Sequence, residues 1–215
     1  MPGSVRGVTL KPLDVVIRDR IAPGLVPAGF KRKGRLFTLE NEVGDRACVD
    51  VRSFPLGLHD AEFNIDLHIQ PRIWRDFLTR DGDTIFGLWQ SRLGPSGGQA
   101  GAGRDLWSID LEDEAAGSHL SATLAVALPW FLHYLDADNL LAYARNPTDP
   151  ISKVGSSPET LIPMLLAARG ASEELEQRLA SLAAEVPDKR RGFDTPGFAA
   201  FLRAWMADHT PKETT

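Results

Sequence analysis

Residues 28–69 read AGFKRKGRLFTLENEVGDRACVDVRSFPLGLHDAEFNIDLHI, and the order of turn and strand signals within them predicts the fold. The end of this stretch, Glu62–Ile69, alternates strictly between apolar and polar side chains. A period of two is typical of a strand in a sheet that buries one face, which favours antiparallel pairing. Arg46–Phe54 alternates in the same way, and Arg35–Glu40 reads as a shorter strand before the polar turn Asn41–Asp45.

Helical patterns flank these strands. Apolar side chains recur at helical spacing in Lys11–Pro23, where a Pro-Gly pair is expected to end the helix. Pro71–Thr79 reads as a second helix, and Ala115–Leu135 as a much longer one in which Pro129 predicts a kink or a break. Between these two helices, Arg104–Leu111 alternates as a fourth strand.

The last third of the chain is helical throughout. Pro158–Arg169 is expected to be capped by Ser156 or Ser157 and to end at Gly170. Ser172 caps the next helix, and Pro187 is expected to stop it. The last helix has Pro196 in its first turn and an apolar face within Phe198–Met206. We therefore predict an α+β fold with an antiparallel sheet of about four strands, helices packed on one face, and C-terminal helices. The expected divisions are a disordered lead at 1–9, an α+β domain at 10–145, a C-terminal helical extension at 156–208 and a tail at 209–215.

Charge and cysteine content limit the classes of function. The 215 residues include 24 Lys or Arg and 29 Asp or Glu, and the net charge of −5 argues against a general nucleic-acid binder. The single cysteine, Cys48, allows no intramolecular disulfide and no thiolate metal site. The most apolar run, Leu120–Leu135, is too short and too polar to span a bilayer, and no secretory signal is recognised. We therefore expect a cytoplasmic protein without a membrane segment.

A basic cluster follows Gly29 in a stretch that reads as a turn. Its members are Lys31, Arg32, Lys33 and Arg35, and positions 1–36 as a whole carry eight Lys or Arg against two Asp. Clustered cations of this kind bind phosphate groups or an acidic protein partner. The alternative is a solvated turn beside an edge strand, where lysine discourages aggregation.

Five polar residues are expected to share one face of the sheet if the apolar faces of both strands meet the helices. They are Asp50, Arg52, Asn64, Asp66 and His68. One interpretation is a solvent-facing ladder of cross-strand ion pairs, each contributing about 0.2–1 kcal/mol. A second is a surface that binds a protein or a small ligand. A third is catalysis or metal binding, because a carboxylate beside a histidine can act as base and orienter.

Two tryptophans border the Gly-rich loop Gly94–Gly103. Trp89 and Trp107 either pack in the core or line a groove, since tryptophan is favoured at interfaces. The stretch around Trp89, Ile85–Leu93, fits a helix or a strand equally well. The loop has neither the strand-helix context nor the Lys-Ser/Thr pair of a phosphate-binding loop, so we do not assign it that role.

The run Gly29–Gly34 (GFKRKG), the aromatic Phe37 and the strand FNIDLHI together resemble the bacterial domain of unknown function family 4304. In that family a helix leads to a GF-K/R-K-G turn and then to strands, and Ala127–Phe131 (ALPWF) resembles its C-terminal part. The resemblance covers roughly residues 10–145. It implies an α+β fold and no activity, and Arg52 stands where the family often carries glutamine, so no shared ligand contact is implied there. Small bacterial domains of this general kind suggest, by analogy, interaction or toxin-neutralising proteins.

The leading hypothesis is a non-enzymatic binding module, with another protein as its partner. It requires the polar face or the basic turn to be exposed and contiguous, without a deep cleft. The alternative is a small-ligand binder or a hydrolase-like enzyme, in which Asp50, Arg52, Asp66 and His68 line a concave pocket and His68 has a strongly shifted pKa. Nucleic-acid binding through Lys31–Arg35 is disfavoured by the net charge. We find no nucleophile with a matching base and no cofactor or metal motif, so we predict no catalytic residue, no cofactor and no metal, and we leave the oligomeric state open.

Overall fold

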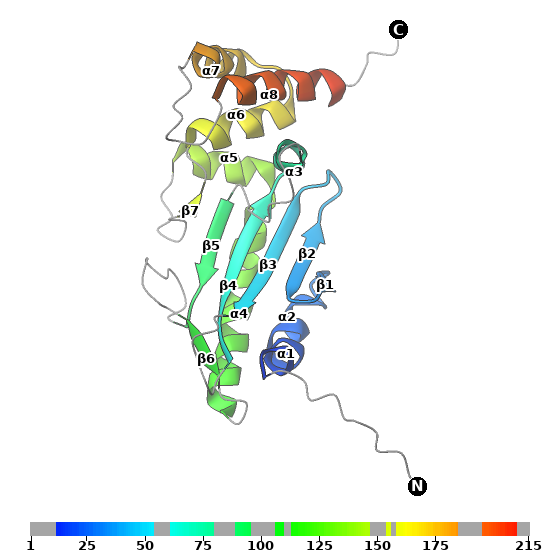
Figure 1. Cartoon of the computed structure of the whole chain (residues 1–215), viewed down its shortest axis with the longest axis vertical. Coiled ribbons are helices and arrows are strands. Elements are labelled where there is room, and N and C mark those ends of the chain that lie inside the picture. The colour runs from blue at the N-terminus through cyan, green and yellow to red at the C-terminus, as the bar shows by residue number, and fades with distance from the viewer. Residues whose placement is uncertain are drawn as a thin grey trace.

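The computed structural model has the α+β architecture that the sequence predicts (Figure 1). It describes residues 12–53, 61–79, 89–95, 106–109, 113–146, 154–155, 158–184 and 195–209. Several predictions lie outside these ranges: the lead at 1–9, most of the Gly-rich loop, the helix cap at Ser156 or Ser157, the helix stop at Pro187, and the tail after residue 209.

One seven-stranded sheet, antiparallel at every pairing, forms the centre of the fold. The strands follow the order β1-β2-β3-β4-β5-β7, and β6 pairs with the first residues of β4. The predicted count of about four strands is low for two reasons. β1 and β7 have only three and two residues, too few for an alternating pattern, and the stretch that forms β5 fits a helix equally well. The strands are β1 Lys31–Lys33, β2 Leu36–Glu40, β3 Arg46–Ser53, β4 Ala61–Gln70, β5 Trp89–Leu93, β6 Trp107–Ile109 and β7 Val154–Gly155.

The register gives the sheet one apolar face. Phe37 lies opposite Val49, and Val49 lies opposite Leu67, so side chains from β2, β3 and β4 form one continuous row. All three are buried. The alternation in Glu62–Ile69 therefore predicted the correct set of core residues for β4.

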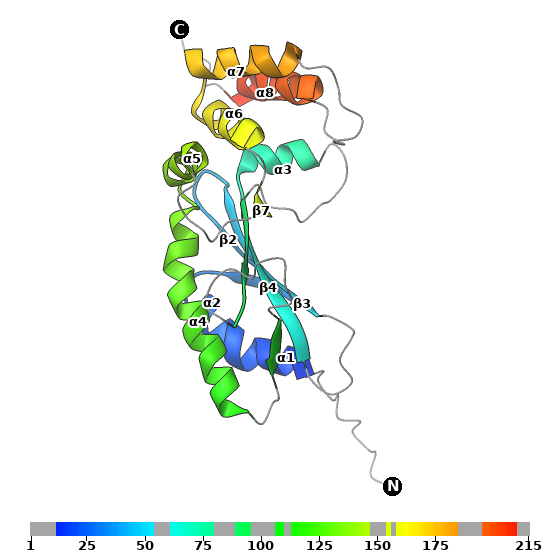
Figure 2. The same ribbon diagram turned by 90° about the vertical axis from the view of Figure 1, so that its left-hand side faces the viewer.

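Helix α4 covers this apolar face along most of its length (Figure 2). Its Leu124 and Phe131 meet Val49 and Leu67 of the sheet around one small space. At the edge of the same face, the Trp89 ring of β5 stacks 6.0 Å from the Phe131 ring. The helices are α1 Pro12–Val16, a π-helical turn Ile17–Ile21, α2 Ala22–Leu25, α3 Arg72–Leu78, α4 Glu114–His133, α5 Ala137–Arg145, α6 Pro158–Arg169, α7 Glu173–Ala184 and α8 Thr195–His209.

Pro23 does not end the first helix and Pro129 does not break α4, although the sequence predicts an end at Pro23 and a kink or a break at Pro129. The first helix continues past Pro23 because α2 restarts after the π-helical turn, which places Pro23 in a first turn that needs no N–H donor. Helix α4 runs unbroken through Pro129. The carbonyl that loses its donor there belongs to Ala125, and because Ala125 and Pro129 are both exposed, water can satisfy it.

Helix α4 is also long and apolar enough, by length and composition alone, to cross a membrane. The core helix of a soluble protein can have the same length and composition. In this fold Leu120, Leu124 and Phe131 are buried on the sheet side, whereas Val126 is exposed on the outer side. One face of α4 therefore supplies much of the core.

The C-terminal helices belong to the same hydrophobic core as the sheet. Gly170 ends α6 with a φ of +107°, and the Ser172 hydroxyl accepts a hydrogen bond from the Leu175 N–H at 3.2 Å, as predicted. Figure 1 shows α6, α7 and α8 stacked beyond one end of the sheet, next to α3. Helix α3 therefore lies between the sheet and the C-terminal helices.

Candidate functional site

The five polar residues predicted to share a face do share it. They lie on neighbouring strands β3 and β4, opposite to the face that α4 covers. Their arrangement follows from the register, because directly opposed residues on antiparallel strands project to the same side. The opposed pairs on this polar face are Cys48–His68, Asp50–Asp66 and Arg52–Asn64.

The polar face is not the solvent-facing ladder of ion pairs that was one interpretation of the sequence. Asn64 is 1% exposed, Asp66 7% and His68 2%. An alternating sequence indicates that one face of a strand is polar, but it does not indicate what packs against that face. The burial of these three side chains could therefore not be predicted from the strand pattern. Arg52, by contrast, keeps 41% of its side chain exposed.

A charge network crosses three strands at the centre of this face. Arg52 Nε donates a hydrogen bond to Asp50 Oδ2 at 2.7 Å and lies 3.5 Å from Asp66 Oδ2. Arg92, which lies opposite Asp66 on β5, donates from Nε to Asp66 Oδ1 at 2.9 Å. The Asn64 amide reaches both oxygens of Asp66 at 3.3 Å. Two opposed carboxylates would repel each other, and the two guanidinium groups offset that repulsion.

Arg92 is a site residue that the sequence analysis missed. Its strand follows the period of two, with Trp89, Ser91 and Leu93 buried and Gln90 and Arg92 between them. That alternation was present in the sequence but short enough to fit a helix as well. Read as a strand, it would have placed Arg92 on one face of the sheet.

His68 and Asn64 leave hydrogen-bonding atoms unpartnered. Both ring nitrogens of His68 and the Oδ1 atom of Asn64 are buried and have no hydrogen-bond partner within the described part of the chain. Burial lowers the pKa of His68 from its usual value, and the charge of nearby Asp66 opposes that shift. Because His68 makes no hydrogen bond to Asp66, the oriented base of a catalytic pair is not formed here.

Cys48 offers no reactive thiolate on this face. Burial raises the pKa of its thiol to about 12, and its sulfur contacts the Gln70 side chain at 3.4 Å. Among the described residues, no three His, Cys, Asp or Glu side chains are grouped so as to hold a metal ion. The face therefore offers charge and hydrogen bonding but no nucleophile that is ready to react.

The predicted basic turn is mainly an edge strand. Lys31–Lys33 form β1, and only the step from Gly34 to Arg35 turns the chain, with Gly34 at a φ of +64°. The prediction of a turn was wrong because three consecutive cations carry no alternation that would mark a strand.

The four basic residues do not all lie on the same side of the sheet. Lys31 lies opposite Thr38 and Lys33 opposite Leu36, and both are therefore on the side of the sheet that carries the polar face. Arg32 projects to the other side, where its guanidinium lies 5.7 Å from the centre of the Phe37 ring. Arg35 donates to the Ser53 hydroxyl and pairs with Asp14. The structure thus brings two of the four cations to the polar face.

Trp107 does not line a groove. It is 2% exposed, and its indole N–H donates to the Leu93 carbonyl at 2.8 Å. Trp89 is equally buried, against Trp130, Phe131 and Tyr134. Both tryptophans are core residues, because each lies on the apolar side of its strand.

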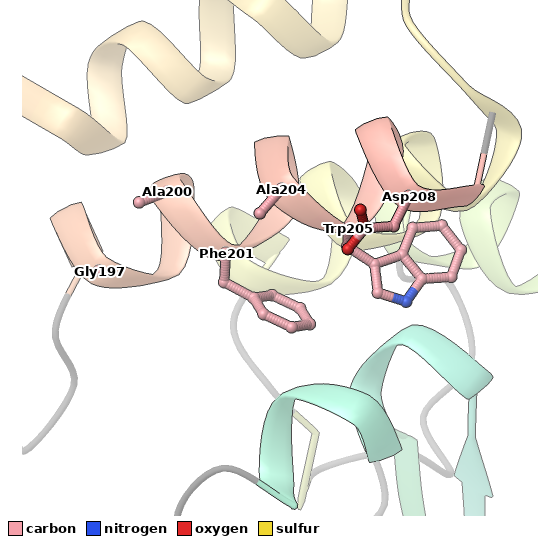
Figure 3. Close-up of a pocket in the computed structure, with 6 residues that line it drawn as sticks. All are labelled: Gly197, Ala200, Phe201, Ala204, Trp205 and Asp208. Carbon is pink, nitrogen blue, oxygen red and sulfur yellow. The ribbon is translucent and has the colours of Figure 1, made fainter.

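A groove of about 430 Å³ lies along α8, away from the polar face (Figure 3). Phe201 and Trp205 project from α8 toward α3, and small side chains form much of the remaining wall. Two side chains of the wall carry polar groups: the Trp205 indole N–H, which already donates to Asp76 at 2.9 Å, and the Asp208 carboxylate. The groove therefore offers apolar contact with few free polar groups.

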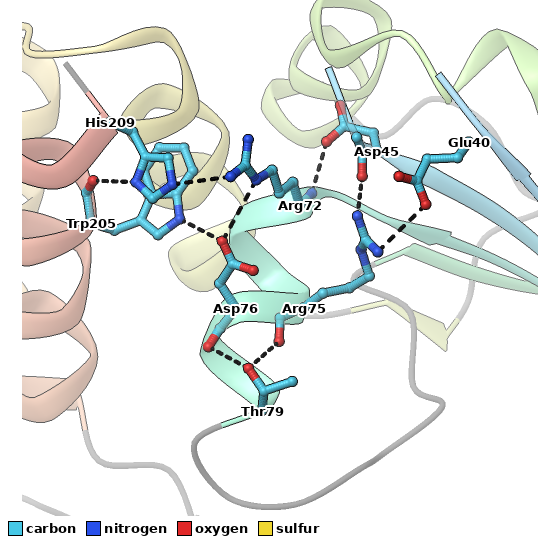
Figure 4. A network of polar contacts seen from close by, with 9 residues as sticks. Glu40, Asp45, Arg72, Arg75, Asp76, Thr79, Trp205 and His209 are labelled. Carbon is cyan, nitrogen blue, oxygen red and sulfur yellow. Dashed lines mark hydrogen bonds and ion pairs between the residues drawn. The ribbon is translucent and has the colours of Figure 1, made fainter. Parts of the chain in front are cut away.

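A second polar network ties α8 to α3 and to the hairpin between β2 and β3 (Figure 4). The Arg72 backbone N–H donates to Asp45 at 2.8 Å, while its guanidinium lies 3.3 Å from His209 Nε2. Arg75 donates to the Gly44 carbonyl. These contacts span three parts of the chain and hold elements in place, so we assign them a structural role.

No family model, curated protein sequence or solved structure matches this chain. The resemblance to the bacterial domain of unknown function family 4304 stays a prediction.

Proposed function

We propose that this chain is a cytoplasmic, non-enzymatic binding module that binds an acidic protein partner through the exposed cations of its polar sheet face. The observation that carries the proposal is the charge of that face. The register places five cations on it, Lys31, Lys33, Arg46, Arg52 and Arg92, together with four carboxylates, Glu40, Asp50, Glu62 and Asp66. Those nine groups sum to +1, in a chain whose net charge is −5.

Around the central network the accessible part of the face is basic, because the exposed carboxylate of Glu40, at the end of β2, is already paired with Arg46 at 2.8 Å. Lys31 and Lys33 are exposed, and Arg92 keeps 42% of its side chain exposed, whereas the side chain of Asp66 is only 10% exposed. A partner therefore meets cations first and carboxylates only beneath them. Complementary charge of this kind steers association and selects the partner more than it adds affinity.

The chemistry of the face favours binding over catalysis. The buried His68 is not oriented by a carboxylate, and the pKa of Cys48 is raised to about 12. General-base catalysis requires a base within hydrogen-bond reach of the proton it takes, with a pKa near the working pH. A small-ligand site remains the second candidate, because the unpartnered atoms of His68 and Asn64 leave hydrogen bonds to be made.

The proposal is tested by binding of a fluorescent glutamate homopeptide, followed by anisotropy, with a glutamine homopeptide as the uncharged probe. A variant with Lys31→Gln, Lys33→Gln, Arg52→Gln and Arg92→Gln is expected to bind the acidic peptide at least about tenfold more weakly than the parent protein. The matched control changes Arg18, Arg145, Arg169 and Arg203 to Gln, which removes the same charge from other surfaces. Equal loss in both variants would mean attraction to net charge alone and would sink the proposal.

A further inference from the structure

We infer that Arg52 and Arg92 form a two-guanidinium clamp for a single carboxylate group of the ligand. The inference rests on the proposed function and names the chemical group that the polar face recognises. Its basis is the way in which the two side chains are held, which is distinct from the overall charge of the face.

Both guanidinium groups converge on one side chain. Arg92 Nε lies 2.9 Å from one oxygen of Asp66, and Arg52 Nε lies 3.5 Å from the other. They therefore lie on either side of the same carboxylate, one from β5 and one from β3. Two planar guanidinium groups that flank one carboxylate can share one further carboxylate between them.

The anchoring uses only one donor of each arginine. The hydrogen bonds of Arg52 and Arg92 within the described part of the chain come from Nε alone. Toward the same described residues their terminal Nη groups, with four N–H donors on each side chain, make none. Because each side chain is about two-fifths exposed, these donors are open to an incoming acceptor.

The groups beneath the clamp restrict its geometry. Asp50 holds Arg52, and the Asn64 amide holds Asp66, which in turn holds Arg92. Both carboxylates are almost wholly buried, so their positions are fixed by packing. An arginine that is already ordered loses less side-chain entropy when it binds, which favours a specific carboxylate contact over a diffuse one.

A purely structural ion-pair cluster would explain the Nε contacts of the two arginines. It would not explain why buried polar atoms beside them have no hydrogen-bond partner. Asn64 Oδ1 is buried beside the clamp without a donor, and both ring nitrogens of His68 are buried without a partner two residues beyond Asp66. Native proteins leave few such atoms unsatisfied. Three of the five buried side-chain atoms that have no partner among the described residues lie on this face, as expected where a polar ligand completes its hydrogen bonding.

The test distinguishes the contribution of the paired guanidinium N–H donors to binding from the contribution of the positive charge. In the variant Arg52→Lys with Arg92→Lys, all charges remain but the paired N–H donors are lost. The companion variant, Lys31→Gln with Lys33→Gln, loses two charges and keeps the clamp. The probes are the glutamate homopeptide and free glutarate, which carries the same carboxylate chemistry as a small molecule.

We expect the double-lysine variant to bind the acidic peptide at least about tenfold more weakly than the parent protein, and the companion variant to lose less affinity. Peptide titration of isotope-labelled parent protein should shift the side-chain NMR signals of Arg52 and Arg92, a readout that holds even if a variant folds poorly. Tight glutarate binding that the peptide cannot displace would keep the clamp but replace the protein partner with a small acid.

Two other results would overturn the clamp. The double-lysine variant could bind as the parent protein does while the fourfold glutamine variant does not. In that case the overall charge explains the binding, the proposed function is supported, and the clamp is wrong. If neither probe binds the parent protein and the arginine signals do not move, the clamp and the proposed function both fall.

Discussion

Replacing His68 by leucine should stabilise the fold. The side chain is 2% exposed, and neither ring nitrogen has a hydrogen-bond partner within the described residues. A buried polar group without a partner costs about 1–3 kcal/mol, and leucine has a similar volume without that cost. Since some of the gain is lost to imperfect repacking, we expect His68→Leu to raise the free energy of unfolding by about 1–2 kcal/mol at neutral pH.

The gain should grow as the solution becomes more acidic. Burial lowers the pKa of folded His68, and of the charged groups that act on it Asp66 and Asp50 oppose this shift while Arg52 adds to it. The unfolded chain, with a histidine pKa of about 6.5, then binds the proton first. The parent protein therefore loses stability as pH falls from about 6.5 toward the lowered folded pKa, at up to about 1.4 kcal/mol per pH unit. The leucine variant lacks this loss.

The assay is urea unfolding followed by tryptophan fluorescence at a series of pH values. The quantity to compare is the difference in unfolding free energy between the variant and the parent protein, which cancels the titration of the carboxylates. His133→Leu is the matched control, because it removes an exposed imidazole from α4. A His68→Leu variant less stable than the parent by more than about 1 kcal/mol, or a pH-independent difference, would mean that His68 has a favourable partner and would refute the reasoning.

Three further predictions concern the core, the thiol and a turn. Phe131→Ala, at a fully buried position against the sheet, should cost about 3–5 kcal/mol in the same urea assay, and a cost below about 1 kcal/mol would contradict the packing of α4. Cys48 should resist alkylation in the folded protein, because burial raises the pKa of its thiol to about 12; labelling as fast as in urea would show that the thiol is accessible. Gly29→Ala should destabilise by about 1–2 kcal/mol, since φ is +94° there and a Cβ would lie 3.3 Å from the Leu39 side chain; an unchanged melting temperature would argue against that turn geometry.

The sequence predicted the elements whose pattern is long and regular. Glu62–Ile69 has eight alternating residues, and the structure extends it by only one residue at each end. Pro158–Arg169 has the bounds that its capping and terminating residues indicate. Lys31–Lys33 could not be found in the same way, because a three-residue strand of like charges is defined by its partner, β2, and not by its own pattern.

The sequence predicted which residues of β3 and β4 share the polar face, but not how deeply they are buried. Period-two spacing and antiparallel pairing were sufficient to bring Asp50 and Asp66 together. The same information could not predict the burial of His68, because burial depends on segments that are distant in sequence. The second arginine of the clamp was missed for a related reason, since Arg92 acquires its role only once β5 pairs with β4.

Contacts made by helix α3 are expected to couple the unfolding of α8 to the unfolding of the adjoining end of the sheet. Its neighbouring residues face opposite ways: Arg75 bonds the Gly44 carbonyl in the β2–β3 hairpin, while Asp76 accepts from Trp205 and Phe77 packs against Phe198 of α8. An opening of α8 that removes the second set of contacts weakens the support for the first. Amide protons in α8 should therefore exchange with solvent through the same cooperative opening as those at the adjoining end of β4, and not through independent fraying of a C-terminal helix.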